Sequence, residues 1–278
     1  MVGPLHPWRD TLHDLGVIGL IPAGGTPETA REQQATPIPD QAPQRLKGEK
    51  TGTAGSAPET RPVRPRDPGP SAPASADPVS HPPPQTVAGA GTLAELEAAI
   101  HGCLVCPLGG GRIKFVFGEG DPQAGLMFIG EGPGRDEDLK GRPFVGKAGE
   151  LLDRMLAAIG LERGQVYIAN VVKCRPPDNR TPTSLEAQAC LGYLKRQIEL
   201  IRPKVIVTLG ATPLRELLGV QAGITRIRGQ WQRLEMLGGI PVMPTFHPAY
   251  VLRQYTQEVR RAVWSDLQAT RKWLDGAR

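Results

Sequence analysis

Beyond residue 90, two patterns of apolar residues alternate along the chain: short continuous runs and repeats every three or four positions. Short continuous apolar runs bounded by turn residues are typical of buried strands. Such runs occupy residues 126–129, 166–172, 205–209 and 240–243. Elsewhere, apolar residues recur every three or four positions, as in amphipathic helices. These helical segments are residues 92–100, 148–159, 184–201, 213–218 and 258–274, the first of them capped by Thr92. Strands that alternate with helices predict the α/β class, as a three-layer α/β/α sandwich around a mostly parallel, four-stranded central sheet.

The first 90 residues differ in composition from the rest. They contain 17 of the 29 prolines but only one of the 13 aromatic residues, Trp8. A Pro/Ala/Ser-rich segment with so few large apolar side chains cannot bury enough surface to offset the entropy of ordering its backbone. We therefore predict a disordered N-terminal tail over residues 1–90 and a folded domain over residues 91–278. The tail is either a simple extension, or it carries a peptide around Trp8 that binds a protein partner.

Charge is also distributed unevenly. The tail carries 8 of the 33 basic and 9 of the 28 acidic residues, so the remaining 25 basic and 19 acidic residues give the domain a net charge of +6. A basic surface favours a phosphate-rich partner such as nucleic acid, although an excess of this size is weak support by itself. No apolar run approaches the length of a membrane span, so we expect a soluble protein.

Four cysteines, all in the domain, are the clearest chemical signal: Cys103, Cys106, Cys174 and Cys190. The Cys-x-x-Cys pair places two thiols on one side of a turn, and the two later cysteines can complete a four-thiolate site. A structural zinc ion usually uses two such pairs, whereas fifteen residues separate Cys174 from Cys190. Two disulfides require an oxidising compartment, and the first ten residues do not resemble a secretion signal. An iron–sulfur cluster tolerates irregular spacing best, but spacing alone leaves all three alternatives open.

In a parallel α/β sheet, ligands bind beyond the carboxyl ends of the strands. Four loops there carry unusual residues, namely 130–138, 141–149, 170–179 and 245–253. Phe144 lies between turn residues, Asn170 interrupts a run that should be buried, and His247 is the only histidine beyond residue 101. A packing or hydrogen-bonding role in the structure is the ordinary interpretation of each. The functional alternatives are a stacking surface, an amide that reads a ligand and a histidine in a site.

Taken together, the four loops resemble one family. Their sequences are Gly-Glu-Gly-Pro-Gly-x-x-Glu-Asp from Gly130, Gly-Arg-Pro-Phe-Val-Gly-x-Ala-Gly from Gly141, Asn-Val-Val-Lys-Cys-Arg-Pro-Pro from Asn170 and His-Pro-Ala-Tyr-x-Leu-Arg from His247. They are similar to motifs of the family 4 uracil-DNA glycosylases, the iron–sulfur branch of the uracil-DNA glycosylase superfamily in bacteria and archaea. The resemblance covers about residues 93–275, with the motifs in order and all four cysteines in place.

This resemblance implies an enzyme of base-excision repair. Such an enzyme flips uracil out of DNA and hydrolyses its N-glycosidic bond, which releases free uracil and leaves an abasic site. It also implies that the cofactor is a [4Fe–4S] cluster with four cysteine ligands. These are Cys103, Cys106, Cys174 and Cys190.

The resemblance assigns roles in the uracil pocket as well. It implies that Phe144 stacks on the base and that Asn170 reads its N3–H and O4 groups. Glu137 would lie against C5, where a thymine methyl group would clash. His247 would donate a hydrogen bond to O2 as negative charge builds on the leaving base.

A segment after the last predicted strand resembles a loop that presses into the minor groove of DNA. The residues of this segment are Tyr250, Val251, Leu252 and Arg253. We expect Val251 and Leu252 to act as apolar wedges and Arg253 to contact phosphate.

The group that positions the attacking water follows less directly from the resemblance. Where the best-known glycosylases of the superfamily have an aspartate in the first motif, this chain has Gly132. The remaining candidates are Glu131, Glu137 and Asn179, and we favour backbone groups at Glu131 and Gly132 with help from Asn179. No lysine in the motifs is placed as an obvious Schiff-base nucleophile, so we expect a monofunctional glycosylase that cuts no strand.

Two rival functions remain at this point. One is the uracil-binding branch that crosslinks to DNA through a histidine in a Lys-Arg-Arg-Ile-His insertion, but residues 173–182 contain neither the insertion nor a histidine. The other is a non-catalytic iron–sulfur protein that binds DNA or senses redox state. For the expected enzyme, the partner is uracil-containing DNA, single- or double-stranded. We expect a monomer that is cytoplasmic and associated with the nucleoid.

Overall fold

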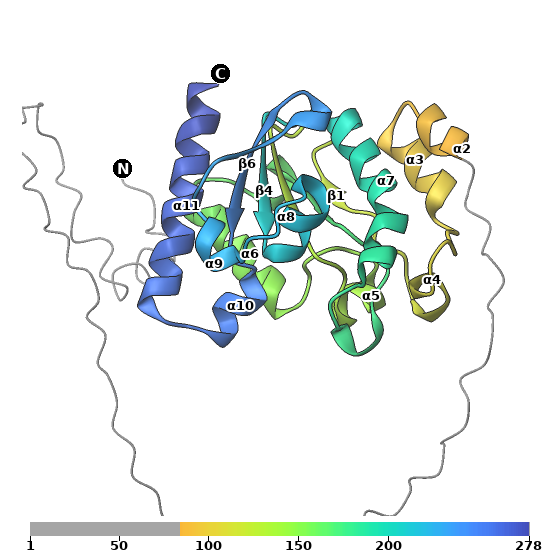
Figure 1. The fold of residues 1–278 in the computed structure, drawn as a ribbon, viewed down its shortest axis with the longest axis horizontal. Coiled ribbons are helices and arrows are strands. Elements are labelled where there is room, and N and C mark those ends of the chain that lie inside the picture. The colour runs from red at the N-terminus through yellow and green to blue at the C-terminus, as the bar shows by residue number, and fades with distance from the viewer. Residues whose placement is uncertain (1–83, 278) are drawn as a thin grey trace, which may run out of the picture. The chain divides into compact units, whose positions relative to one another are not determined.

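The computed structural model describes residues 84–277, which form a single α/β domain (Figure 1). The predicted tail falls mostly on residues 1–83, including the peptide around Trp8, and these lie outside the described residues. At its C-terminal end the predicted tail was too long. Helix α2 (Pro84–Gly89) forms there and contacts α3 and α7, because Val87 and Ala90 pack against the apolar core.

One six-stranded sheet forms the centre of the domain, with the strand order β1-β3-β2-β4-β6-β5. The strands are β1 (Glu119–Gly120), β2 (Leu126–Gly130), β3 (Tyr167–Asn170), β4 (Val205–Leu209), β5 (Gln232–Leu234) and β6 (Ile240–Thr245). The four central strands are parallel and correspond to the four predicted ones. The prediction of four strands was wrong, because it missed the two edge strands, β1 and β5, which pair antiparallel with their neighbours. With two and three residues and little apolar character, β1 and β5 give no recognisable period in the sequence.

Helices cover both faces of the sheet, so the predicted three-layer sandwich is confirmed (Figure 1). One face packs against α2, α3 (Leu93–Ile100), α7 (Ser184–Ile201) and α8 (Ala211–Leu218). The other packs against α6 (Lys147–Ala158), α10 (Pro248–Arg253) and α11 (Gln257–Gly276). Alternate residues of a strand point to opposite faces, and therefore Met127 and Ile129 join the first core while Leu126 and Phe128 join the second.

Shorter elements lie in the connections. These are α4 (Leu108–Gly111), α5 (Arg135–Lys140), α9 (Ile224–Ile227) and the 3₁₀ turns η1 (Arg163–Gln165), η2 (Pro177–Asn179) and η3 (Glu235–Leu237). No helix within residues 84–277 is long and apolar enough to cross a membrane.

The parallel strands bring their carboxyl ends to one edge of the sheet. In the sheet register Gly130 at the end of β2 lies beside Asn170 at the end of β3, and Leu209 of β4 lies beside Thr245 of β6. The loops that follow these four residues therefore begin side by side, although they are far apart in the sequence. This edge is where a ligand site is expected in such a sheet.

Candidate active site

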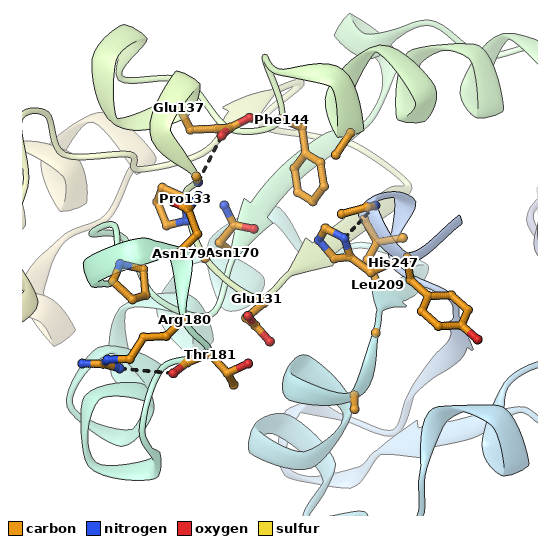
Figure 2. Close-up of a pocket in the computed structure, with 18 of the residues that line it drawn as sticks. Glu131, Pro133, Glu137, Phe144, Asn170, Asn179, Arg180, Thr181, Leu209 and His247 are labelled. Atoms are coloured by element: carbon orange, nitrogen blue, oxygen red, sulfur yellow. Dashed lines mark hydrogen bonds between the residues drawn. The ribbon is translucent and has the colours of Figure 1, made fainter. Parts of the chain in front are cut away.

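A pocket of about 520 Å³ opens at the carboxyl edge of the sheet (Figure 2). Loops after β2, β3, β4 and β6 all contribute to its wall. Nine of the predicted site residues line it: Glu131, Gly132, Glu137, Phe144, Asn170, Asn179, His247, Tyr250 and Arg253. The structure thus brings together residues that span 123 positions of the sequence, from 131 to 253. Val251 and Leu252 are not part of the wall.

An aromatic ring, an amide and an imidazole face the same space in the pocket. Figure 2 shows the side chains of Phe144, Asn170 and His247 converging there. The rings of Phe144 and His247 lie 5.5 Å apart at an angle of 31°. Gly130 makes room for this group, since a Cβ atom on it would lie 2.4 Å from Asn170 Oδ1 and 2.6 Å from Phe144 Cζ. A larger residue than glycine at position 130 would displace the ring or the amide.

Asn170 is almost completely buried, at 2% exposure, yet its Oδ1 atom has no hydrogen-bond partner within the described part of the chain. A buried amide oxygen without a partner is uncommon, because the lost interaction with water is not replaced. The ordinary interpretation of Asn170 as part of a buried network therefore does not account for this atom. An acceptor that is desolvated and open to the pocket can bind an N–H group of a ligand.

His247 is held in one tautomer by its own helix. It precedes α10, and its Nδ1 atom accepts the backbone N–H of Ala249 at 3.1 Å. A neutral ring whose Nδ1 accepts carries its proton on Nε2, which is then a donor. Burial lowers the pKa of His247 to about 4, and the positive charge of Arg253 lowers it further in the same direction. The imidazole is therefore neutral at physiological pH.

Glu137 joins the first two loops. Its Oε2 atom accepts the N–H of Gly134 at 3.0 Å, and its Oε1 atom accepts those of Val145 and Gly146 at 2.8 and 3.0 Å. Three backbone donors thus fix the carboxylate in place. The segment that carries Phe144 is consequently tied to the loop after β2.

Glu131 has a partner that we did not expect from the sequence. Its Oε2 atom accepts a hydrogen bond of 2.5 Å from the hydroxyl of Thr212, in the first turn of α8. The adjacent Gly132 lies against Val172, whose Cγ2 would be 2.7 Å from a Cβ atom at position 132. The wall at this point is therefore shaped by a glycine backbone and one oriented carboxylate.

Asn179 lies in a loop with an unusual backbone. Asp178 and Asn179 have φ angles of 53° and 54°, in the left-handed region that few residues other than glycine occupy. The Asn179 Oδ1 atom accepts a hydrogen bond of 2.7 Å from Nε of Arg175. This bond fixes the orientation of the amide at the pocket wall, where its NH₂ group is the donor.

The predicted DNA-contacting segment forms the short helix α10, which separates its four residues. Tyr250 and Arg253 line the pocket, and Leu252 is 37% exposed. Val251 is only 3% exposed and packs in the apolar core, so its prediction as a surface wedge was wrong. A helix sends successive residues to different sides, and a sequence motif alone does not reveal which side faces inward.

The four predicted thiol ligands gather in one region. Cys103 and Cys106 follow α3, Cys174 follows β3, and Cys190 lies in α7. All four are free cysteines, so the disulfide alternative has no support in the structure. Burial raises the pKa of Cys174 to about 11 and that of Cys190 to about 12. Negative charge on neighbouring cysteines would raise both pKa values further, whereas Arg112 lowers that of Cys174 and Lys173 lowers that of Cys190.

Two polar side chains, Arg112 and Tyr193, lie next to sulfur atoms of this region. Arg112 donates to Cys174 Sγ at 3.3 Å and to the carbonyl oxygen of Cys103 at 2.5 Å, while the Tyr193 hydroxyl lies 3.2 Å from Cys103 Sγ. Cations and donors near sulfur favour thiolates. Within residues 84–277, no three His, Cys, Asp or Glu side chains lie close enough together to hold a single metal ion.

Lys173 lies between the cysteine region and the pocket. Its ammonium group is fully buried and donates to the backbone oxygen of Asn170 at 2.9 Å and to Gln197 Oε1 at 2.6 Å. Burial lowers the pKa of Lys173 to about 8. Gln197 in turn donates to the backbone oxygen of Phe117 at 3.0 Å. The backbone oxygen of Asn170 is therefore held by a buried polar network that Lys173 extends to Gln197 on α7.

The loop after β4 was missed in the sequence. Leu209, Gly210 and Ala211 line the pocket, and Thr212 binds Glu131. The rule that directs ligands to carboxyl ends of parallel strands applies to β4 as to the others. This rule could have identified the loop. Its residues, however, include no histidine, asparagine, carboxylate or aromatic side chain that would indicate a ligand site.

Comparison with known proteins identifies related chains. The family model of the uracil DNA glycosylase superfamily matches residues 117–268. A type-4 uracil-DNA glycosylase from Thermotoga maritima is 49% identical over 173 residues, which are 62% of this chain and 89% of the relative. One from Archaeoglobus fulgidus is 45% identical over 182 residues, 64% of this chain and 90% of the relative. A type-5 uracil-DNA glycosylase from Pyrobaculum aerophilum is 30% identical over 145 residues, 47% of this chain and 63% of the relative.

Proposed function

This chain belongs to the uracil DNA glycosylase superfamily, and we propose that it acts as a type-4 enzyme that removes uracil from DNA. The reaction hydrolyses the bond between N1 of uracil and C1′ of deoxyribose, so free uracil leaves and an abasic site remains. The observation that carries the proposal in the pocket is the buried, unpartnered Oδ1 of Asn170 beside Phe144 and the neutral His247. These three groups match the face, edge and developing charge of a flipped uracil.

Recognition of uracil begins with Phe144 and Asn170. A base that leaves the DNA stack can place its face on the Phe144 ring. Asn170 Oδ1 then accepts the N3–H of uracil, and its amide NH₂ donates to O4. Cytosine has an unprotonated N3 and an amino group at position 4, which reverses both requirements. The mismatch would cost on the order of 1–3 kcal/mol.

Thymine differs from uracil only by a methyl group at C5, and Glu137 is the residue proposed to exclude it. The carboxylate lines the pocket and is held by three backbone N–H groups. A side chain fixed in this way cannot move aside without breaking those bonds. A methyl group directed at it would meet a rigid wall.

Cleavage of the glycosidic bond leaves negative charge on uracil, mostly at its oxygens. The tautomer of His247 places its proton on Nε2, which can donate to O2 as this charge develops. Because the ring is already neutral, no proton has to be removed before the reaction. A neutral donor also keeps its proton while it stabilises the leaving base.

Water is proposed to attack C1′ from the side of Glu131, Gly132 and Asn179. The Thr212 hydroxyl orients the Glu131 carboxylate, and Arg175 orients the Asn179 amide. Positioned acceptors and donors of this kind can hold a water molecule next to the sugar. Lys173 cannot serve as an amine nucleophile from its place, because it is fully buried and bound to two oxygens. The enzyme is therefore proposed to be monofunctional.

The four cysteines are proposed to ligate a [4Fe–4S] cluster. The donor set suits this group, because its four free thiols come from three segments, with Arg112 donating to Cys174 Sγ and the Tyr193 hydroxyl next to Cys103 Sγ. When bound, the cluster would supply a covalent link between these segments and, with four thiolates on its irons, no open position for substrate. A preparation with about four irons per chain would support the assignment, and one zinc per chain would contradict it.

DNA is proposed to lie across the pocket mouth and to contact α10. Arg253 would bind phosphate, Tyr250 would border the flipped nucleotide, and the exposed Leu252 would enter the minor groove. The enzyme is proposed to act as a monomer. Association with the nucleoid would follow from binding to DNA.

An assay on a single-stranded oligonucleotide with one uracil tests the proposed reaction. We expect strand cleavage only after alkali, because an abasic site is stable until base is added. The same oligonucleotide with thymine or cytosine in place of uracil is the control and should stay intact. A nick without alkali would contradict the monofunctional mechanism, a covalent adduct on a denaturing gel would indicate the trapping branch, and no reaction at all would refute an enzyme.

A further inference from the structure

Phe144, the proposed stacking residue, has an unusual backbone. Its φ angle is 51°, in the left-handed region that bulky side chains rarely occupy. Such a conformation persists only where surrounding contacts hold it. The contacts that hold this turn therefore decide where the stacking ring lies.

One side of the turn is held by groups already described. Glu137 accepts the N–H groups of Val145 and Gly146, directly after Phe144. Gly149 in α6 packs closely on the turn, since a Cβ atom there would lie 1.9 Å from the carbonyl oxygen of Phe144. The contacts with Glu137 satisfy N–H groups of the turn, so the carbonyl oxygens of Pro143 and Phe144 need other hydrogen-bond donors.

Arg163 binds both of those carbonyl groups. It lies in η1, after α6, and its guanidinium donates from Nη1 to the Phe144 oxygen at 3.0 Å and from Nη2 to the Pro143 oxygen. Its side chain is only 19% exposed. Arg163 does not line the pocket.

Two carboxylates hold the guanidinium itself. Glu119, in the edge strand β1, accepts from Nε of Arg163, and Asp153 in α6 accepts from Nη1 at 3.0 Å. Glu119 also accepts from Arg142 Nε at 2.6 Å. Burial alone would raise the pKa of Glu119, but the hydrogen bonds from Arg142 and Arg163 outweigh it and lower the pKa. The carboxylate is thus ionised and keeps Arg163 in place.

We infer that Arg163 is a positioning residue for uracil recognition, which holds Phe144 in its left-handed conformation by binding two successive carbonyl oxygens. The inference rests on the proposed function, because it assumes that the Phe144 ring stacks on uracil. Arg163 touches neither the base nor the reacting bond. It acts through the backbone that carries the stacking ring.

The geometry requires arginine rather than any cation. A planar guanidinium has five N–H donors in a fixed fork and can bind two carbonyls and two carboxylates at once. A lysine ammonium is a compact group with three donors on a flexible stem. Arg163→Lys keeps the charge near Glu119 but cannot reproduce both carbonyl bonds.

The inhibition constant of free uracil in the glycosylase reaction tests this inference. Free uracil makes no DNA contacts, so its affinity reports the pocket itself. We expect Arg163→Ala to raise the inhibition constant about tenfold and Arg163→Lys to raise it by a smaller factor. KM for uracil-containing DNA should rise more than kcat falls, because stacking is present before and during bond cleavage. Thermal unfolding, measured alongside, confirms that each variant is folded at the assay temperature.

Arg142→Ala is the matched control. It removes an ion pair to the same Glu119 but no bond to the Phe144 turn, so the inhibition constant should change less than about twofold. Phe144→Ala is the reference for loss of stacking. If Phe144→Ala leaves the inhibition constant unchanged, the proposed stacking role is wrong. If Phe144→Ala raises it while folded Arg163→Ala does not, stacking stands and the role of Arg163 is overturned.

Discussion

The pocket and the cysteine region lie at the two ends of one short segment, residues 170–174, yet they are built by different means. The pocket is assembled from loops that begin at the carboxyl ends of four parallel strands, and it keeps the Asn170 Oδ1 atom without a partner. The cysteine region joins a loop after α3, the loop after β3 and helix α7, with Arg112 donating to Cys174 Sγ and the Tyr193 hydroxyl next to Cys103 Sγ. One region thus leaves a polar atom for a ligand, whereas the other is proposed to hold a permanent metal centre.

This difference suggests separate roles, with the reaction assigned to the pocket and structural support assigned to the cysteine region. A reacting ligand must enter and leave, so its site needs unpaired groups that a rigid sheet holds in place. A resident metal centre can instead contribute to folding itself. Lys173 connects the two, because it is next to Cys174 and donates to the backbone of Asn170. The following changes test whether the two regions have these separate roles.

Loss of one thiol should have the largest effect on stability. We expect Cys190→Ser, in the middle of α7, to release iron and to lower the free energy of unfolding by more than about 5 kcal/mol. Iron content and thermal unfolding measure both effects. A variant that loses its iron and yet unfolds at the wild-type temperature would show that the cysteine region does not stabilise the fold.

Removal of the imidazole should affect the reaction without affecting the cysteine region. We expect His247→Ala to lower kcat by about 10²–10³, as for other donors to a developing oxyanion. Iron content should match the wild-type protein. His101→Ala is the matched control, since His101 lies outside the pocket. A drop in rate of the same size in both variants, or a loss of iron from His247→Ala, would contradict separate roles for the pocket and the cysteine region.

A change at the connecting lysine should affect both regions. We expect Lys173→Met to destabilise the protein by about 1–3 kcal/mol, because Gln197 Oε1 and the Asn170 carbonyl lose a buried donor. The rate should fall as well, since Asn170 loses its anchor. Urea unfolding and the glycosylase assay measure the two effects. Lys195→Met, on the same α7 helix as Gln197, is the control and should change stability by less than about 0.5 kcal/mol.

The pH dependence of the pocket should give the smallest effect. His247 has an ordinary pKa near 6.5 when unfolded and about 4 when folded, so the unfolded chain binds its proton first as the pH falls. The stability contributed by the neutral ring is present above pH 6.5 and is lost as the pH falls toward 4. Between pH 7 and pH 5 we expect a loss of about 1–2 kcal/mol that is absent from His247→Gln.

Activity should follow a different pH course from stability. Because the folded imidazole stays neutral down to about pH 4, the contribution of His247 to kcat should be constant between pH 8 and about pH 5. A pH–rate profile measures this directly. A step in kcat near the ordinary pKa of histidine would show that the ring is charged in the enzyme and that the proposed neutral donor is wrong.

Much of the fold could be predicted because the sheet is buried on both faces. Strands such as β2 then appear as uninterrupted apolar runs, and α7 has a capping residue, Thr183, and a clear helical period. The edge strands β1 and β5 lack this signal, since their pairing depends on a neighbour and not on their own side chains. Helix α2 was missed for a similar reason, as it is stabilised by contacts with α3 and α7.

The sequence by itself determined which residue types are available: four cysteines, and motifs that begin at Gly130, Gly141, Asn170 and His247. Residue type and local spacing are properties of the chain before it folds. Only the tertiary structure decided that Val251 faces the core, that Thr212 binds Glu131 and that Arg163 holds the Phe144 turn. Each of these depends on which side of a helix faces inward or on contact between segments far apart in the sequence. Such contacts exist only once the sheet has brought those segments together.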